Sequence, residues 1–107
     1  MTRGEVFRLR TPRGGRRGHE QTGERYAVVL QNTELDLSTV IVAPTSTSAR
    51  PTLFRPEVTV ASKLTLVLPE QLGVIDCTRL GTSEGLLGHD DLRAVDKALR
   101  LVLGLRH

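Results

Sequence analysis

Residues 18–32, GHEQTGERYAVVLQN, carry the pattern from which the fold and the chemistry of this chain can be worked out. A polar segment punctuated by glycines leads into an almost continuously apolar run at 26–30, which predicts a buried β-strand. Arg25 stands where the two meet. A guanidinium stays protonated and presents a fixed fork of donors, so it suits a phosphate or a carboxylate. The stretch therefore predicts a phosphate-containing partner, bound by an arginine that a rigid strand supports.

The segments on either side of this stretch predict more β-structure. Residues 4–10 alternate charged and apolar side chains, as expected of a strand with one face in water. The glycines and prolines of residues 11–23 predict a long loop. A second buried strand is expected at 39–43, and it should end or reach a sheet edge at Pro44, because proline cannot donate to a sheet ladder. Residues 45–50, TSTSAR, then form a hydroxyl-rich loop.

The second half of the chain begins with further strands. Three short ones are expected, at residues 57–60, 64–68 and 71–75. The first two form a hairpin that turns at 61–63. Gly73 is a weak point in the third strand, where a bulge can form. Residues 76–80 predict a single helical turn.

One helix is expected, at residues 90–103. Its apolar residues recur at helical spacing, acidic residues cluster in its first turn, and Gly104 follows its last turn. Short strands followed by such a helix predict a mainly β fold with some α-structure. We expect a strongly bent sheet or half-open barrel of about five to seven strands, on which the apolar stripe of the helix docks.

Composition limits what this fold can contain. A chain of 107 residues of which 38% are hydrophobic fits one small domain, residues 1–107. The aromatic residues are Phe7, Tyr26 and Phe54, so the core must be aliphatic. The same scarcity argues against a platform on which several RNA bases stack.

The cysteine content and the first residues of the chain favour the cytoplasm. Cys77 is the only cysteine, so it has no partner for an intramolecular disulfide. The first residues contain no apolar stretch of the length that a signal peptide or a membrane span needs. Cys77 lies in IDCTRL with no nearby histidine, so we expect a packing residue rather than a nucleophile.

Positive charge is concentrated at the N-terminal end of the chain. Residues 1–25 contain seven arginines and three glutamates, a net charge of +4, whereas the remaining residues contain eight basic and nine acidic side chains, a net charge of −1. Arginine pairs bidentately with phosphate. An arginine-rich segment of this kind favours a nucleic acid as the partner over a solvated loop that only aids solubility.

Four motifs occur in an order and at a spacing similar to those of one protein family. They are RGEVF at 3–7, GHEQTGERYAVVLQN at 18–32, STVIVAPTS at 38–46 and PEQLGVIDCTRL at 69–80. Together with the amphipathic helix that follows, they cover nearly the whole chain. The series resembles the MazF/PemK/Kid family of toxin endoribonucleases, and its most specific part is a G-x-E-Q-x-G-x-R segment that leads into a buried strand.

The resemblance implies an SH3-like β-barrel that forms a homodimer and acts as the toxin of a type II toxin–antitoxin system. It implies sequence-specific cleavage of single-stranded RNA, in particular messenger RNA, without a metal ion or other cofactor. In the family, the ribose 2′-hydroxyl attacks its own phosphate and leaves a 2′,3′-cyclic phosphate and a 5′-hydroxyl end. A cognate antitoxin with an acidic, disordered tail neutralises such a toxin by occupying its RNA groove.

The resemblance also assigns residues to the site. The catalytic arginine of the family falls on Arg25, and its catalytic hydroxyl, most often a threonine, falls on Ser46. A shift of one residue would replace Ser46 by Thr45 or Thr47, so the source of the hydroxyl stays open among the three. Tyr26 departs from the proline that usually follows the arginine.

The general base stays open as well. Glu20 has suitable chemistry and lies in the same segment as Arg25, and the adjacent His19 titrates near neutral pH. Glu20 can equally pair with an arginine of that segment, and His19 can contact RNA. The RNA-binding residues that we expect are Arg16, Arg17, His19, Gln21, Thr47 and Gln71. The three histidines and one cysteine show no metal-ligand spacing, so no metal site is predicted.

Two other functions are alternatives to RNA cleavage for this chain. The first is a gyrase poison of the related CcdB type, which has a similar barrel but relies on a tryptophan in its C-terminal tail, and this chain contains no tryptophan. The second is a catalytically inactive barrel that binds RNA or protein. The presence of Arg25 together with a hydroxyl at Ser46 argues against this second alternative, and the serine in place of threonine at position 46 keeps it open.

Overall fold

The sheet of the computed structural model is centred on two antiparallel neighbours, β2 (Tyr26–Val29) and β3 (Thr39–Ser46). Both come from apolar runs of the sequence. The structure describes residues 1–10 and 25–105 of the chain. The remaining elements are β1 (Glu5–Leu9), β4 (Glu57–Val60), β5 (Lys63–Val67), η1 (Pro69–Gln71), β6 (Gly73–Asp76), η2 (Cys77–Arg79), β7 (Leu80–Leu86) and α1 (His89–Leu103).

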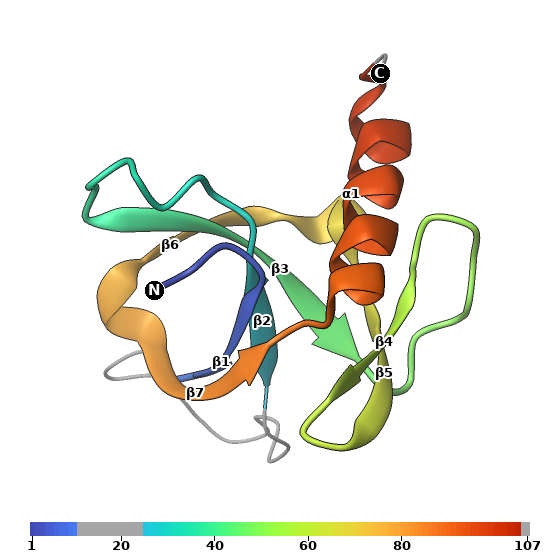
Figure 1. Ribbon diagram of the computed structural model, residues 1–107, viewed down its shortest axis with the longest axis horizontal. Coiled ribbons are helices and arrows are strands. Elements are labelled where there is room, and N and C mark those ends of the chain that lie inside the picture. The colour runs from blue at the N-terminus through green and yellow to red at the C-terminus, as the bar shows by residue number, and fades with distance from the viewer. Residues whose placement is uncertain (11–24, 106–107) are drawn as a thin grey trace, which may run out of the picture.

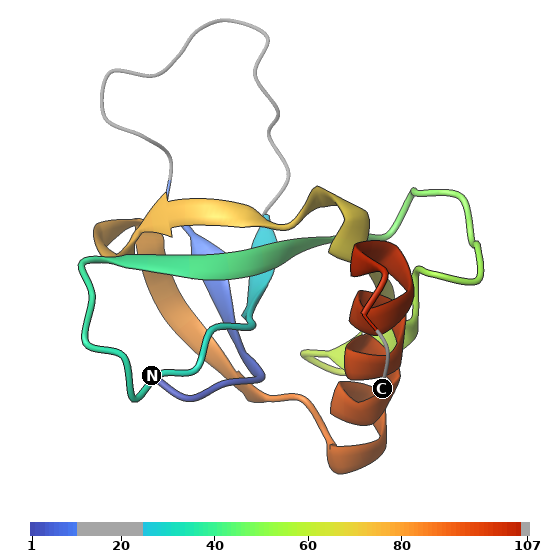
Figure 2. The ribbon, with the colours of Figure 1, turned by 90° about the horizontal axis from the view of Figure 1, so that it is seen from above.

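Seven antiparallel strands form a sheet that curls into a half-barrel. The strand order is β4-β5-β3-β2-β1-β7, and β6 pairs with β3 outside this path. Figure 1 shows β7, β1 and β2 curled together on one side, with the β4–β5 hairpin and α1 on the other. In Figure 2, β3 and β6 run side by side along the top of the sheet, as their pairing requires. The predicted fold class, mainly β with a C-terminal helix, is confirmed.

β2 is buried on both of its faces, which explains its continuous apolar sequence. One face contributes Val28 to a cluster that includes Val95 of α1, and the other contributes Ala27 and Val29 to a second cluster. All four side chains are 0% exposed. Full burial of one such valine contributes about 1.5–3 kcal/mol. β2 is therefore a well-anchored support for Arg25, the residue that precedes it. The buried hydrophobic side chains of the described residues are Val, Leu and Ala, so the expectation of an aliphatic core is confirmed.

β3 runs through Pro44 instead of ending there, so the predicted end of this strand is wrong. Up to Val42, β3 pairs with β6, and from Thr45 onward it pairs with β5. Pro44 lies at the change of partner, where its carbonyl accepts a hydrogen bond from Leu68 N at 2.9 Å. The missing N–H of proline therefore falls between two ladders. As a result Thr45 and Ser46 belong to β3 and not to the loop predicted after Pro44.

β4 and β5 form the predicted hairpin, with a turn of two residues. Val60 pairs with Lys63, so the turn consists of Ala61 and Ser62. Their φ angles are 52° and 67°, in the left-handed region. Two-residue hairpins of this type need positive φ at both turn positions, which strains residues other than glycine. The turn starts β5 one residue earlier than the sequence predicts.

The segment after β5 differs from the prediction in two places. Gln71 ends the 3₁₀ helix η1 and does not begin a strand, because Pro69 at the start of η1 favours a helical turn. β6 begins at Gly73, which pairs regularly with Val42, so the expected bulge is wrong. The helical turn predicted at 76–80 is confirmed as η2, in which the Asp76 carboxylate accepts a hydrogen bond from the main-chain N–H of Thr78.

β7 is not among the strands that the sequence predicts. Its sequence, LGTSEGL, has two glycines and no clear alternation of apolar and polar residues. Pairing with β1 stabilises it, since it forms an antiparallel ladder along that strand. A side chain at Gly81 would place its Cβ 2.8 Å from the carbonyl oxygen of Arg8, so the close approach of the two strands requires this glycine.

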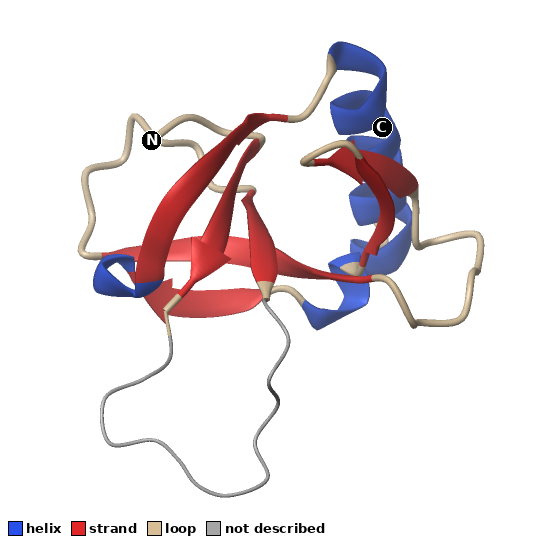
Figure 3. Cartoon of the chain, turned by 90° about the horizontal axis from the view of Figure 1, so that it is seen from below, coloured by secondary structure: helices blue, strands red, loops and turns tan. Residues whose placement is uncertain are grey.

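α1 packs against the β4–β5 end of the sheet, as Figure 3 shows. It begins at His89 and buries Val95 and Ala98. Gly104 ends it with a φ of 71°, and its N–H bonds to the carbonyls of Arg100 and Leu101. The N-terminal residues are tied to the helix by an ion pair of 2.8 Å between Arg3 and Asp96.

Candidate functional site

A cavity of about 810 Å³ lies where β2 begins, β3 ends and the β4–β5 hairpin turns. Four of the site residues predicted from the sequence line it, and they are Arg25, Ser46, Thr47 and Gln71. Among the described residues, its other polar lining residues are Tyr26, Thr45, Ser48, Lys63 and Thr65. The cavity thus combines two cationic side chains with a group of hydroxyls, which is suitable chemistry for binding an anion.

The register of β2 on β3 brings Arg25 and Ser46 together. Ala27 pairs with Pro44 in the last pair of the β2–β3 ladder, and Arg25 and Ser46 each lie two residues beyond this pair, at the same end of the two strands. β1 holds Arg25 from its other side, because the carbonyl of Arg25 accepts a hydrogen bond from Leu9 N at 2.8 Å. A permanent cation and a hydroxyl therefore face the same cavity from neighbouring strands.

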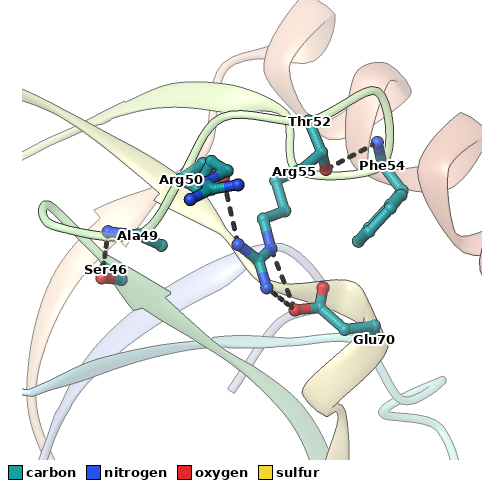
Figure 4. Close-up of polar contacts among 7 residues, drawn as sticks. All are labelled: Ser46, Ala49, Arg50, Thr52, Phe54, Arg55 and Glu70. Atoms are coloured by element: carbon teal, nitrogen blue, oxygen red, sulfur yellow. Dashed lines mark hydrogen bonds and ion pairs between the residues drawn. The ribbon is translucent and has the colours of Figure 1, made fainter.

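The hydroxyl of Ser46 is held by the turn that follows β3. Its Oγ accepts hydrogen bonds from the main-chain N–H groups of Ser48 and Ala49, at 3.2 and 3.0 Å (Figure 4 shows the second). Since a hydroxyl has two acceptor positions and one donor, its hydrogen remains to donate to a ligand or to Ser48 Oγ, 3.5 Å away. The two N–H donors also polarise the hydroxyl and strengthen it as a donor. Ser46 can therefore cap the turn and bind an anion at once.

An ion pair fastens the loop after Ser46 to η1, which carries Gln71. Arg55 Nε and Nη2 both donate to Glu70 Oε2, at 3.0 and 2.7 Å, and Arg55 Nη1 donates to the carbonyl of Arg50 at 3.0 Å (Figure 4). The side chains of Arg55 and Glu70 are only 19% and 25% exposed, so water competes weakly with the pair. The pair connects two sides of the cavity.

The Arg55–Glu70 pair should make stability depend on pH. Burial alone would raise the pKa of the Glu70 carboxyl, but the hydrogen bonds and charge of Arg55 outweigh burial and hold that pKa below its ordinary value of 4.5. The stabilisation is then complete above pH 4.5 and is lost as the pH falls through the lower pKa of the folded protein. We expect Glu70→Gln to lower the free energy of unfolding at pH 7 by about 1–3 kcal/mol.

Urea unfolding between pH 7 and pH 3 measures this effect. In Glu70→Gln the free energy of unfolding should decline less steeply with falling pH than in the unchanged protein. The reason is that the substitution removes a carboxyl whose ionised form is stabilised by folding. Glu57→Gln, at an exposed position of β4, is the control and should keep the original decline. Equal declines in all three proteins would contradict a stabilising role of Glu70.

Both the sequence and the arrangement of elements match known proteins. The model of a family described as PemK-like, MazF-like toxin of type II toxin–antitoxin systems matches residues 2–103. The chain belongs to this family. The resemblance seen in the four sequence motifs is thereby confirmed.

Relatives of this MazF-like toxin include a candidate toxin of Mycobacterium tuberculosis, which is 40% identical over 106 residues and is matched over 98% of this chain and 99% of its own length. A solved MazE–MazF structure from Deinococcus radiodurans is 26% identical, has a TM-score of 0.76, and is matched over 99% of this chain and 97% of that chain. An endoribonuclease from a mycobacterial species, solved in complex with its cognate antitoxin, has a TM-score of 0.76 at 17% identity, over 100% of this chain and 98% of that chain.

Some of the predicted site residues of the MazF-like toxin line the cavity, and the others lie outside the described residues. Arg25, Thr47 and Gln71 are exposed around the cavity, and Ser46 is half-buried. Thr45, the other alternative for the hydroxyl, also lines the cavity and is half-buried. The remaining predicted residues lie outside the described ranges, and they are Arg16, Arg17, His19, Glu20 and Gln21.

Two cavity residues of the MazF-like toxin, Lys63 and Thr65, are not among those that the sequence predicts. They lie two residues apart on β5 and therefore share one face of that strand. Only the pairing of β5 with β3, in which Leu66 lies opposite Ser46, brings them to the site. The signal in the sequence is the alternation in KLTLV, which sets a lysine and a threonine on the same face.

Within residues 1–10 and 25–105 of the MazF-like toxin, no group of three or more His, Cys, Asp or Glu could hold a metal ion. No helix of these ranges has the length and apolar character needed to cross a membrane. Cys77 is half-buried, packs against the second core cluster and donates from Sγ to the carbonyl of Leu37 at 3.7 Å, as expected of a packing residue.

Proposed function

We propose that this MazF-like toxin is an endoribonuclease that cleaves single-stranded RNA, in particular messenger RNA, at short sequence motifs and without a metal ion. The observation that supports this most directly is that Arg25 and Ser46 line one cavity from neighbouring strands. A guanidinium fork and a hydroxyl that face one cavity suit the two non-bridging oxygens of a phosphodiester. The solved endoribonuclease that shares the fold supports the same class of reaction.

The proposed reaction is an internal transesterification. The 2′-oxygen of one nucleotide attacks the adjacent phosphorus, and the bond from phosphorus to the 5′-oxygen of the next nucleotide breaks. The proton of the 2′-hydroxyl passes to a base and the leaving oxygen takes up a proton, which gives a 2′,3′-cyclic phosphate and a 5′-hydroxyl. Arg25 stabilises the charge that accumulates on the non-bridging oxygens, and Ser46 donates a further hydrogen bond to them.

Proton transfer and RNA binding are proposed for residues of the segment before β2. Glu20 is the proposed base, with His19 as the alternative base or as an RNA contact. Arg16, Arg17 and Gln21 are proposed to bind RNA from the same segment. Thr47 and Gln71 would bind it from the other side of the cavity, where both are exposed.

Loss of messenger RNA would inhibit translation and growth in the cytoplasm, and a cognate antitoxin would prevent this. We propose an antitoxin with an acidic, disordered tail, since the N-terminal part of the chain is rich in arginine. Relatives that were solved together with their antitoxin support such a partner. A homodimer is proposed from the family resemblance.

Incubation of the purified chain with a long single-stranded RNA in the presence of a chelator tests the proposed function. We expect discrete cuts, and end-group analysis should find cyclic phosphates and 5′-hydroxyl groups at them. Cleavage that requires one particular divalent ion would contradict the metal-independent mechanism. If the folded, antitoxin-free protein makes no cut, the proposal fails, and inhibition of DNA gyrase in a supercoiling assay would then support the CcdB-like alternative.

A further inference from the structure

The β4–β5 hairpin contains a buried hydroxyl that the fold itself does not use. Thr65 lies in the middle of β5 and is 7% exposed. Its cross-strand partner on β4 is Val58, an apolar residue that is 1% exposed. In the part of the chain that the structure describes, Thr65 Oγ1 has no hydrogen-bond partner, although less than 1 Å² of this atom is accessible. Burying a hydroxyl in this way opposes folding, and a valine would have nearly the same shape.

Thr65 also lines the cavity that holds Arg25 and Ser46. Val67, two residues further along β5, pairs with Thr45 of β3, so Thr65 lies on the same face of the sheet as Thr45, which also lines the cavity. The hydroxyl is therefore placed where a ligand of the cavity can supply the partner that the fold lacks.

The surroundings of Thr65 indicate which part of a ligand it meets. Val60 and Leu68 line the same cavity and are buried, which makes an aliphatic wall. Lys63 lies two residues before Thr65, at an exposed position on the same face of β5. Apolar walls with a few well-placed polar groups are typical of sites that bind a flat ring and fix its orientation. A phosphate suits this wall poorly, because its charge would lose water without gaining a cation there.

We propose that Thr65 is a specificity-determining residue, whose hydroxyl hydrogen-bonds the edge of one RNA base. This inference rests on the proposed RNA cleavage. The base lies with its flat face against Val60 and Leu68, beside the phosphate bound by Arg25 and Ser46. Lys63 pairs with the phosphate of the same nucleotide at the rim of the cavity. A hydroxyl can donate or accept, and unstacked bases of single-stranded RNA present both kinds of group on their edges.

Cleavage of a pool of RNAs with random sequence, by the full chain and by Thr65→Val, tests this inference. Sequencing the cut ends gives the base preference at each position of the motif. We expect Thr65→Val to widen the preference at one position and to lower cleavage of the preferred sequence about tenfold, which corresponds to about 1.4 kcal/mol. Thr65→Ser keeps the hydroxyl and should keep the preference. The midpoint of thermal unfolding of Thr65→Val should equal or exceed that of the unchanged protein, because no bond within the fold is lost.

Thr59→Val is a matched control, since Thr59 is an exposed threonine of the neighbouring strand and does not line the cavity. An unchanged base preference in Thr65→Val would overturn the inference. A lower unfolding midpoint with an unchanged preference would do so as well, because it would show that the hydroxyl is bonded inside the protein. Thr65→Ala, which also lacks the hydroxyl, should widen the preference at the same position as Thr65→Val. If the unchanged protein cleaves no RNA, the proposed function has failed, which is a different result from cleavage whose preference ignores Thr65.

Discussion

Replacing Arg25 by alanine is expected to lower the rate of RNA cleavage by at least about 100- to 1,000-fold. The guanidinium is the group proposed to hold two phosphate oxygens while charge builds up on them. Lys63 also lines the cavity, but a lysine is a point charge without the planar fork of arginine. Single-turnover cleavage of a short RNA that contains the motif measures the loss directly.

Two companion variants separate the charge of Arg25 from its shape. Arg25→Lys keeps the charge and loses the fork, so its rate should lie between those of Arg25→Ala and the unchanged protein. Arg93→Ala removes an exposed arginine of α1 and should leave the rate unchanged. The side chains of Arg25 and Arg93 are both exposed, so Arg25→Ala, Arg25→Lys and Arg93→Ala should all fold. A rate for Arg25→Ala within tenfold of the original would contradict its catalytic role.

Among the three adjacent hydroxyls, we expect the one of Ser46 to contribute most. Ser46→Ala should lower the cleavage rate about 100-fold or more, because it removes a donor to the phosphate. The structural reason is that Ser46 lines the same cavity as Arg25, and that two main-chain N–H groups orient its oxygen. Thr45→Val and Thr47→Val should each stay within about tenfold, because the two main-chain N–H groups of the turn orient the oxygen of Ser46 and not those of the threonines.

Ser46 also caps a turn, so its effect on stability has to be measured separately. Ser46→Ala should lower the midpoint of thermal unfolding, whereas Ser46→Thr keeps a hydroxyl and should retain most of the activity. If Thr47→Val or Thr45→Val abolishes cleavage while Ser46→Ala does not, the catalytic hydroxyl belongs to that threonine instead. The variant with the largest loss of cleavage thus identifies the residue that supplies the catalytic hydroxyl.

The sequence predicts the fold well wherever a single pattern dominates a segment. β2 is a run of residues buried on both faces, and α1 has apolar residues at helical spacing with glycine after its end. β7 lacks such a pattern. Its pairing with β1 stabilises it, and its own side chains contribute little. The predicted end of β3 is wrong, because proline stops a strand only where the sheet ladder requires an N–H donor. At Pro44 the partner strand changes, so no such donor is required there.

The site is less predictable than the fold. Arg25 and Ser46 are found through the resemblance of their motifs to a family, and in isolation each would be an ordinary strand-end or turn residue. Lys63 and Thr65 reach the cavity only through pairing between segments that are distant in sequence. No local pattern carries that information, since strand register over long sequence separations depends on the whole sheet.

The pairing of β1 with β2 has a consequence for redesign. Arg8 lies opposite Tyr26, so the ladder holds the two ends of the segment at positions 11–24 beside each other whatever residues occupy it. The free energy needed to close a loop changes slowly with its length. Segments of different length and composition taken from related toxins can therefore be grafted between these two strands, so that their effect on the proposed RNA cleavage can be compared on one unchanged sheet.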